Sequence, residues 1–138
     1  MSDHLQEPDD WKQLVEAART VRSRAYAPYS EYSVGASLQM ADGRLFTGCN
    51  VENASYGLTI CAERAAMCSA VAAGASQPSV VCISATGPLA PCGGCRQFLS
   101  EFNPELLLLL DDCTSPDLPE CVRLDDLLPR AFRLNREV

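Results

Sequence analysis

The chain has 138 residues, which is enough for one domain with a single hydrophobic core and too few for two. Its formal charge of −7 argues against nucleic acid and other polyphosphate partners, because the sequence holds no basic stripe that would neutralise them. No apolar run approaches the roughly 20 residues that a membrane-spanning helix needs, so we expect no membrane insertion.

A polar leader and an amphipathic helix make up the N-terminal region. Residues 1–8 are polar and acidic, unlike a secretory signal or a transit peptide, and we expect them to be disordered. From Asp9 to Ala25 apolar residues recur at helical spacing, and Pro28 then ends the pattern because it restricts the residue before it and lacks an amide proton. A solvated face is predicted for the three arginines along this helix: Arg19, Arg22 and Arg24.

Strand and helix patterns alternate through the rest of the chain. Two alternating runs, 33–40 and 44–49, are joined by an Asp-Gly pair, which is a hairpin signal. An alanine-rich helix over 62–73 ends at Gly74, a residue that suits a helix C-terminus. The remaining predicted elements are a strand over 79–85, a helix over 92–102, a strand over 106–110, a weak strand over 121–123 and a helical turn over 125–128. This order predicts an α/β fold, a three-layer α-β-α sandwich around a mixed five-stranded sheet, as one domain over residues 9–138.

Eight cysteines raise the question of disulfide bonds. Without a secretory signal the chain is expected in the cytoplasm, a reducing compartment where a Cys-x-x-Cys pair indicates metal or redox chemistry. Five of the eight are interpreted as small buried hydrophobic residues: Cys49, Cys68, Cys82, Cys113 and Cys121.

The other three cysteines form a ligand pattern. Cys61 is followed by Ala-Glu, and Cys92 and Cys95 belong to a Pro-Cys-Gly-Gly-Cys segment further along the chain. Three thiolates suit a tetrahedral zinc ion and leave its fourth position open to water, as in catalytic sites, whereas structural zinc sites use four protein ligands. A redox pair would not need Cys61, and a closed zinc knuckle would need a fourth ligand that His4, in the leader, is too remote to supply. The pattern therefore favours a catalytic metal site.

Glu63 and Arg64 follow the first ligand at the start of a predicted helix. The helix dipole alone favours a glutamate in a first turn, but a carboxylate two residues from a metal ligand can also accept a proton from water at the open position. We prefer this catalytic role for Glu63. Three thiolates would leave the site negative, which opposes the ionisation of water. Arg64 is our candidate for relieving that charge by donating to the sulfurs, and the alternative is an ordinary surface arginine.

Several further segments accompany these motifs. They are APYS at 27–30, VGA at 34–36, TGCNVENASY at 47–56, LLP at 127–129 and Phe132. Together with CAER at 61–64 and PCGGCRQ at 91–97, they resemble the small homotetrameric, three-cysteine zinc cytidine deaminases. The resemblance spans roughly residues 10 to 134.

This resemblance implies roles that the patterns alone do not. Asn50 and Glu52 correspond to an Asn-x-Glu pair that holds the ribose 3′-hydroxyl. Tyr32 stands where the family usually has a phenylalanine that packs against the pyrimidine, so its hydroxyl is a departure. Backbone groups at Ala62 and Cys92 would contact the base.

The C-terminal segment carries a further implied contact. Phe132 matches a tail aromatic that reaches into the site of a neighbouring subunit, although Arg133 follows it where the family usually has glycine. A homotetramer with sites near the subunit interfaces is implied by the resemblance alone.

The activity implied is zinc-dependent hydrolytic deamination of cytidine and 2′-deoxycytidine to uridine or deoxyuridine and ammonia, in pyrimidine salvage, with one Zn²⁺ per subunit. Glu63 would carry protons between water and the base. Two alternatives stay open: a blasticidin-type aminonucleoside deaminase, which shares both zinc motifs, and a catalytically inactive zinc-stabilised scaffold. The NVENASY segment at 50–56 favours a cytidine deaminase over a blasticidin-type enzyme. The missing fourth metal ligand argues against an inactive scaffold.

Overall fold

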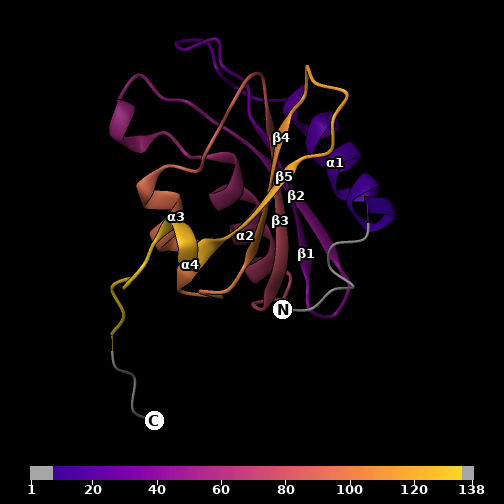
Figure 1. Cartoon of the computed structure of the whole chain (residues 1–138). Coiled ribbons are helices and arrows are strands. Elements are labelled where there is room, and N and C mark those ends of the chain that lie inside the picture. The colour runs from indigo at the N-terminus through magenta and orange to yellow at the C-terminus, as the bar shows by residue number, and fades with distance from the viewer. Residues whose placement is uncertain (1–7, 135–138) are drawn as a thin grey trace.

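Five strands form one mixed sheet in the computed structural model, which describes residues 8–134 (Figure 1). The strand order is β2-β1-β3-β4-β5, in which β3 and β4 are parallel and the other neighbours are antiparallel. In chain order the elements are α1 (Pro8–Arg22), β1 (Gly35–Met40), β2 (Leu45–Cys49), the 3₁₀ turn η2 (Tyr56–Leu58), α2 (Ala62–Ala72), β3 (Pro78–Ala85), α3 (Gly93–Ser100), β4 (Leu107–Asp112), β5 (Glu120–Arg123) and α4 (Leu124–Leu127).

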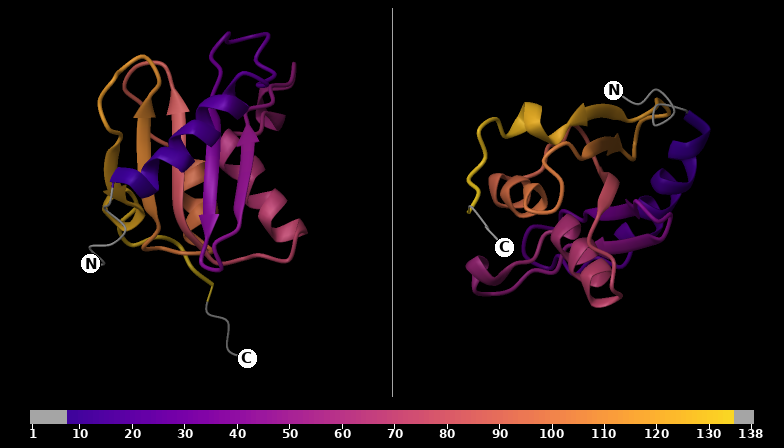
Figure 2. Two further views of the ribbon diagram at one scale, coloured as in Figure 1. Left: turned by 90° about the vertical axis from the view of Figure 1, so that its right-hand side faces the viewer. Right: turned by 90° about the horizontal axis from the view of Figure 1, so that it is seen from below.

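Helices cover both faces of this sheet (Figure 2). The core between α1 and the sheet is formed by Trp11, Leu14, Ala18, Val80, Cys82, Leu107 and Leu109. The core on the opposite face, beneath α2 and α3, includes Leu38, Ala66, Met67, Val81, Ile83, Leu99, Leu108 and Leu110. Alternate residues of β3 and β4 enter separate cores, as the two-residue period of a strand requires. The predicted three-layer α-β-α sandwich is confirmed.

The first helix is shorter than its sequence pattern indicates. The apolar spacing predicts a helix as far as Ala25, but α1 ends at Arg22. The residues that follow pair with another segment of the chain. Tyr26 N donates to the Asn50 carbonyl at 3.0 Å, and the Tyr26 carbonyl accepts from Glu52 N at 2.8 Å. These long-range hydrogen bonds replace the next helical turn.

The other predicted elements agree with the structure to within two residues at each end. Pro8, which we placed in the leader, is the first residue of α1, and the expected disorder of residues 1–7 lies outside the described residues. Within residues 8–134, no helix combines the length and the apolar character that crossing a membrane requires.

Arg19 is exposed, as predicted, but it also forms an ion pair that its position on the helix does not indicate. Its Nε and Nη2 each donate to the Asp111 carboxylate at 2.8 Å, and Asp111 is 1% exposed in β4. Ser84 Oγ donates to the same carboxylate at 2.7 Å. Arg22 is also engaged, because its Nε donates to the Ser33 carbonyl at 2.9 Å. These partners are remote in the sequence, so the spacing of the arginines along the helix could not reveal them.

Cys68 is exposed, which corrects its predicted burial. The buried positions of α2 are Ala62, Glu63, Ala66, Met67 and Ala70, so Cys68 lies on the opposite side of the helix. Cys82 is buried as predicted, and three cysteines are partly buried: Cys49, Cys113 and Cys121. All eight cysteines have free thiols.

Gly48 allows β2 to lie directly against α2. A Cβ at this position would come within 2.5 Å of Ala66 N and 2.6 Å of the Ala62 carbonyl oxygen. Because this helix backbone cannot move aside as a flexible side chain would, we expect Gly48→Ala to destabilise the domain by about 3 kcal/mol or more. Urea denaturation measures the effect. Gly57→Ala is the matched control, since its Cβ would meet nothing within 4 Å, and equal stability of the two variants would contradict the prediction.

Candidate metal centre and active site

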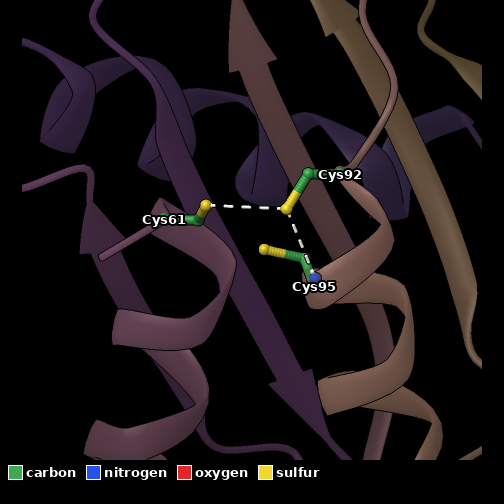
Figure 3. A group of neighbouring side chains, drawn as sticks. All are labelled: Cys61, Cys92 and Cys95. Atoms are coloured by element: carbon green, nitrogen blue, oxygen red, sulfur yellow. Dashed lines mark hydrogen bonds between the residues drawn. The ribbon is translucent and has the colours of Figure 1, made fainter. Parts of the chain in front are cut away.

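Three cysteines converge where two helices begin (Figure 3). Cys61 and Cys92 are the N-cap residues of α2 and α3, and Cys95 lies in the first turn of α3. Their sulfur atoms lie within 4.8 Å of one another, with Cys61 Sγ 3.8 Å from Cys92 Sγ. The Cys95 amide also donates to Cys92 Sγ at 3.4 Å. The unpaired amides and positive dipole end of a helix N-terminus stabilise thiolates, which are the form that binds metal.

The spacing of these sulfurs fits a tetrahedral zinc ion. With zinc–sulfur bonds of about 2.3 Å, two ligands of such an ion lie about 3.8 Å apart. Cys61 Sγ and Cys92 Sγ have this separation. No further His, Cys, Asp or Glu in the described part of the chain joins the three. The protein therefore offers three ligands and leaves one position open, the pattern of a catalytic rather than a structural site.

Glu63 lies in the first turn of α2 and is only 4% exposed. It lines the same cavity as Cys61 and Cys92. Burial, and to a smaller extent repulsion from Cys61, raises the pKa of the Glu63 carboxyl to about 7. A carboxyl that titrates near neutrality can both accept and return a proton, and a bound cation would favour its charged form.

Arg64 contacts the cysteine cluster directly. Its Nη2 donates to Cys61 Sγ at 3.6 Å and to the Thr59 carbonyl at 3.1 Å. Its Nε is buried and has no hydrogen-bond partner among residues 8–134. Hydrogen bonds from the Cys95 side chain and then from Arg64 lower the pKa of the Cys61 thiol to about 5. Both hydrogen bonds favour the Cys61 thiolate, and the bond to Cys61 in turn raises the pKa of the Cys95 thiol.

A cavity of about 390 Å³ opens beside the cluster, within the range of small-molecule sites. Six residues singled out from the sequence line it: Tyr32, Asn50, Cys61, Ala62, Glu63 and Cys92. The remaining lining residues are mostly apolar: Val34, Thr59, Ile83, Ala85, Pro88, Leu89 and Ala90. Cys95 is fully buried and completes the sulfur cluster without lining the cavity.

Asn50 and Glu52 both hold the segment that carries Tyr32. Asn50 Oδ1 accepts from Val34 N at 2.8 Å, and Asn50 Nδ2 donates to the Tyr32 carbonyl at 2.8 Å. The Glu52 carboxylate accepts hydrogen bonds from two backbone amides, at residues 29 and 30, and from the hydroxyl of the serine at position 30. Asn50 also lines the cavity, whereas Glu52 does not.

Phe132 does not line the cavity of its own chain, and it is 69% exposed. Its carbonyl accepts from Gln97 Nε2 at 2.9 Å. The next residue, Arg133, donates through Nη1 to the Ser100 carbonyl at 3.0 Å. Both hydrogen bonds tie the C-terminal tail to α3, beside which the tail leaves the domain (Figure 1).

One wall of the cavity was not predicted from the sequence. Pro88, Leu89 and Ala90 come directly before the Pro-Cys-Gly-Gly-Cys motif, and this adjacency is the signal that could have identified them. No local signal marks Ile83 and Ala85. They reach the cavity because β3 ends there, and only the assembled sheet reveals this.

Comparison with known proteins gives a consistent family assignment. The model of the cytidine and deoxycytidylate deaminase zinc-binding region matches residues 8–110. The chain is 45% identical over 131 residues to the cytidine deaminase of Mycobacterium tuberculosis, covering 93% of this chain and 94% of that protein. It is 40% identical over 125 residues to the cytidine deaminase of Halalkalibacterium halodurans, covering 89% and 94% of the two chains.

A solved structure agrees with these relatives. The crystal structure of cytidine deaminase from Burkholderia pseudomallei matches with a TM-score of 0.82 at 46% identity, covering 88% of this chain and 98% of that one. The chain therefore belongs to the family of zinc-binding cytidine and deoxycytidylate deaminases, as its motifs predict, and zinc is the metal of its three-cysteine site.

Proposed function

We propose that this enzyme hydrolytically deaminates cytidine and 2′-deoxycytidine to uridine or deoxyuridine and ammonia, as a step of pyrimidine salvage. The observation that carries the proposal is a cavity in which an open three-sulfur cluster and the buried carboxyl of Glu63 meet. The names of the similar proteins support cytidine as the substrate. The net charge of −7 and the largely apolar walls suit an uncharged nucleoside better than a phosphorylated one.

Glu63 is proposed to move the protons of the reaction. Zinc held by Cys61, Cys92 and Cys95 supplies Lewis-acid chemistry, which lowers the pKa of water at the open position. Glu63 accepts the proton of the attacking water and gives it to N3 of cytosine as the water oxygen adds to C4. It then takes the remaining proton from the hydroxyl now on C4 and passes it to the amino group, so that the C4–N bond breaks, ammonia leaves and the C4 carbonyl of uridine forms. Burial of Glu63 supports this role, because it keeps bulk water away from the transferred protons.

Arg64 is proposed to tune the charge of the cluster. The three negative charges of the thiolates exceed the two positive charges of Zn²⁺ by one, and this excess negative charge opposes the ionisation of water. The guanidinium that donates to Cys61 Sγ offsets the excess charge. Arg64 therefore acts through the ligand rather than through the substrate.

Replacing Arg64 by glutamine tests this charge. We expect kcat to fall by about 10- to 100-fold, as is typical when a residue that hydrogen-bonds a metal ligand is lost. The rise of kcat with pH should also move to higher pH, because water ionises less readily beside a more negative cluster. The Arg64→Lys control keeps the positive charge and should retain most of the activity. A glutamine variant with the parent pH profile would show that Arg64 is only structural.

The nucleoside is proposed to bind with its base near Tyr32 and Ala62 and its sugar near Asn50. All three residues line the cavity, which supports these contacts. Amide and carboxylate groups suit a sugar hydroxyl, so Asn50 and Glu52 are proposed to hold the ribose 3′-hydroxyl together. Glu52 would exchange its hydrogen bond from the Ser30 hydroxyl for one from the sugar.

We further propose a homotetramer in which Phe132 of one copy reaches the site of another. An apolar surface cluster supports assembly: Tyr26, Tyr29, Val51, Tyr56, Leu58 and Ile60, each between 43% and 77% exposed. Val51 forms backbone bridges with both Tyr26 and Ile60, and the rings of Tyr29 and Tyr56 meet edge to face at 6.3 Å, so most members of the cluster lie beside another member. Contiguous apolar surface of this kind marks interaction sites.

Sedimentation velocity tests this assembly. The parent should sediment as a tetramer, and Leu58→Asp should yield smaller species because it places a charge in the apolar surface cluster. A monomeric parent at micromolar concentration would contradict the proposal.

The cytoplasm is proposed as the compartment in which the enzyme works. All eight cysteines are free, including Cys61 and Cys92, whose sulfurs lie 3.8 Å apart. A reducing compartment keeps such thiols available for zinc.

A substrate panel tests the proposed activity. Zinc-replete protein is mixed separately with cytidine, 2′-deoxycytidine, cytidine 5′-monophosphate and blasticidin S, and the products are separated by chromatography. We expect kcat/KM to be highest for the two unphosphorylated cytosine nucleosides. Turnover of blasticidin S alone would replace the proposal with the aminonucleoside alternative, and bound zinc without any turnover would favour the scaffold.

A further inference from the structure

We propose that the Tyr32 hydroxyl determines how large a pyrimidine the cavity accepts, by tying two of its walls together. This inference rests on the proposed function. One wall is the segment 32–34, which contributes Tyr32 and Val34, and the other is the segment 86–90, which contributes Pro88, Leu89 and Ala90. Tyr32 Oη donates to the Thr86 carbonyl at 3.1 Å and so joins the first wall to the start of the second.

The tyrosine side of this contact is firmly placed. Tyr32 N donates to Ser30 Oγ at 3.0 Å, and the Tyr32 carbonyl accepts from Asn50 Nδ2 at 2.8 Å. Ser30 is itself held by Glu52. With its backbone fixed on both sides, the tyrosine can hold the opposite wall rather than follow it.

The opposite wall is an irregular segment between β3 and α3, and its backbone is held at few points. Gly87 has a φ of 77°, and its amide donates to Asp112 Oδ1 at 3.0 Å. That bond anchors the start of the segment to β4, on the side away from Tyr32. Beyond the other end of the segment, Cys92 belongs to the three-cysteine cluster. The bond from Tyr32 to the Thr86 carbonyl therefore controls how far this wall can move away from the first.

The size limit falls on one edge of the base. In the proposed reaction C4, its amino group and N3 face Glu63, and N1 carries the sugar. C5 is therefore the ring carbon next to the reacting centre that is free to carry an added group. A phenylalanine at position 32, as is usual in the family, would keep the aromatic ring but leave the Thr86 carbonyl untied.

The experiment compares the parent with Tyr32→Phe, which deletes only the hydroxyl. Cytidine and 5-bromocytidine compete in one reaction, and the ratio of their kcat/KM values is measured. A neutral hydrogen bond corresponds to about a three- to tenfold change, so Tyr32→Phe should shift the ratio toward 5-bromocytidine by about that factor. The Thr86→Ala control keeps the acceptor carbonyl and should keep the parent ratio.

Backbone hydrogen exchange gives an independent readout that needs no substrate. Exchange at Gly87, whose amide donates to Asp112 Oδ1, should quicken about three- to tenfold in Tyr32→Phe and stay unchanged in Thr86→Ala. Unchanged exchange in Tyr32→Phe would overturn the tie between the walls. Faster exchange in Tyr32→Phe with an unchanged ratio of the two kcat/KM values would overturn the role of the Tyr32 hydroxyl in specificity. If the parent converted neither nucleoside, the proposed function would fail and the specificity assignment with it.

Discussion

The Glu63→Ala variant is expected to bind zinc and fold like the parent while kcat for cytidine falls by about 10³- to 10⁴-fold, the upper range for loss of a general acid–base group. The loss should be large because the same carboxyl is proposed to serve both proton transfers. Folding should survive, since α2 keeps its other buried residues: Ala62, Ala66, Met67 and Ala70. Steady-state kinetics, zinc content and thermal denaturation measure the three quantities.

The Glu63→Gln variant provides the matched control for shape. Glutamine fills the same space and can hydrogen-bond, but it cannot carry a proton between water and the base. Both variants should be similarly inactive. Near-parent turnover in either one would remove Glu63 from the proposed mechanism, whereas loss of zinc in both would mean that the carboxyl supports the metal site instead.

Replacing Cys95 by alanine should greatly weaken zinc binding and lower activity with it. Cys95 is fully buried, and its sulfur belongs to the three-sulfur cluster. Two remaining thiolates would bind the ion more weakly, and we expect zinc affinity to fall by more than about 100-fold, beyond the range for residues that only support a ligand. Competition with a chelator of known affinity measures the change.

Cys68→Ala is the matched control for the cysteine substitution. Cys68 lies on α2, the helix that Cys61 caps, but it is exposed and outside the sulfur cluster. This variant should keep both zinc and activity. Full zinc binding in Cys95→Ala would contradict the assignment of the third ligand.

The three-cysteine cluster could be predicted from the sequence because the information is local. Cys61 and Cys92 each precede a helical pattern, and the Cys-x-x-Cys spacing places Cys95 one turn later on the same helix. Hydrophobic periodicity likewise located the strands and helices, since each contributes a regular face to one of two cores. The contact between Arg64 and Cys61 follows from their proximity along α2.

Long-range pairing limited the remaining predictions. The Asp111 carboxylate accepts a hydrogen bond from Arg19, which lies 92 positions earlier in the sequence, and no local pattern indicates that contact. The end of α1 was misplaced for the same reason, because Tyr26 pairs with the segment 50–52. The cavity wall over residues 88–90 has no periodicity of its own, so only its position directly before the Pro-Cys-Gly-Gly-Cys motif could have indicated it.

We propose that this chain hydrolytically deaminates cytidine by means of a glutamate beside its zinc site. The most direct measurement quantifies uridine and ammonia formed from cytidine by the zinc-replete parent, with Glu63→Ala at the same zinc content alongside. We expect equal amounts of uridine and ammonia from the parent and almost none from the variant. A parent that holds zinc yet forms no uridine, or a variant that forms it at the parent rate, would contradict this mechanism.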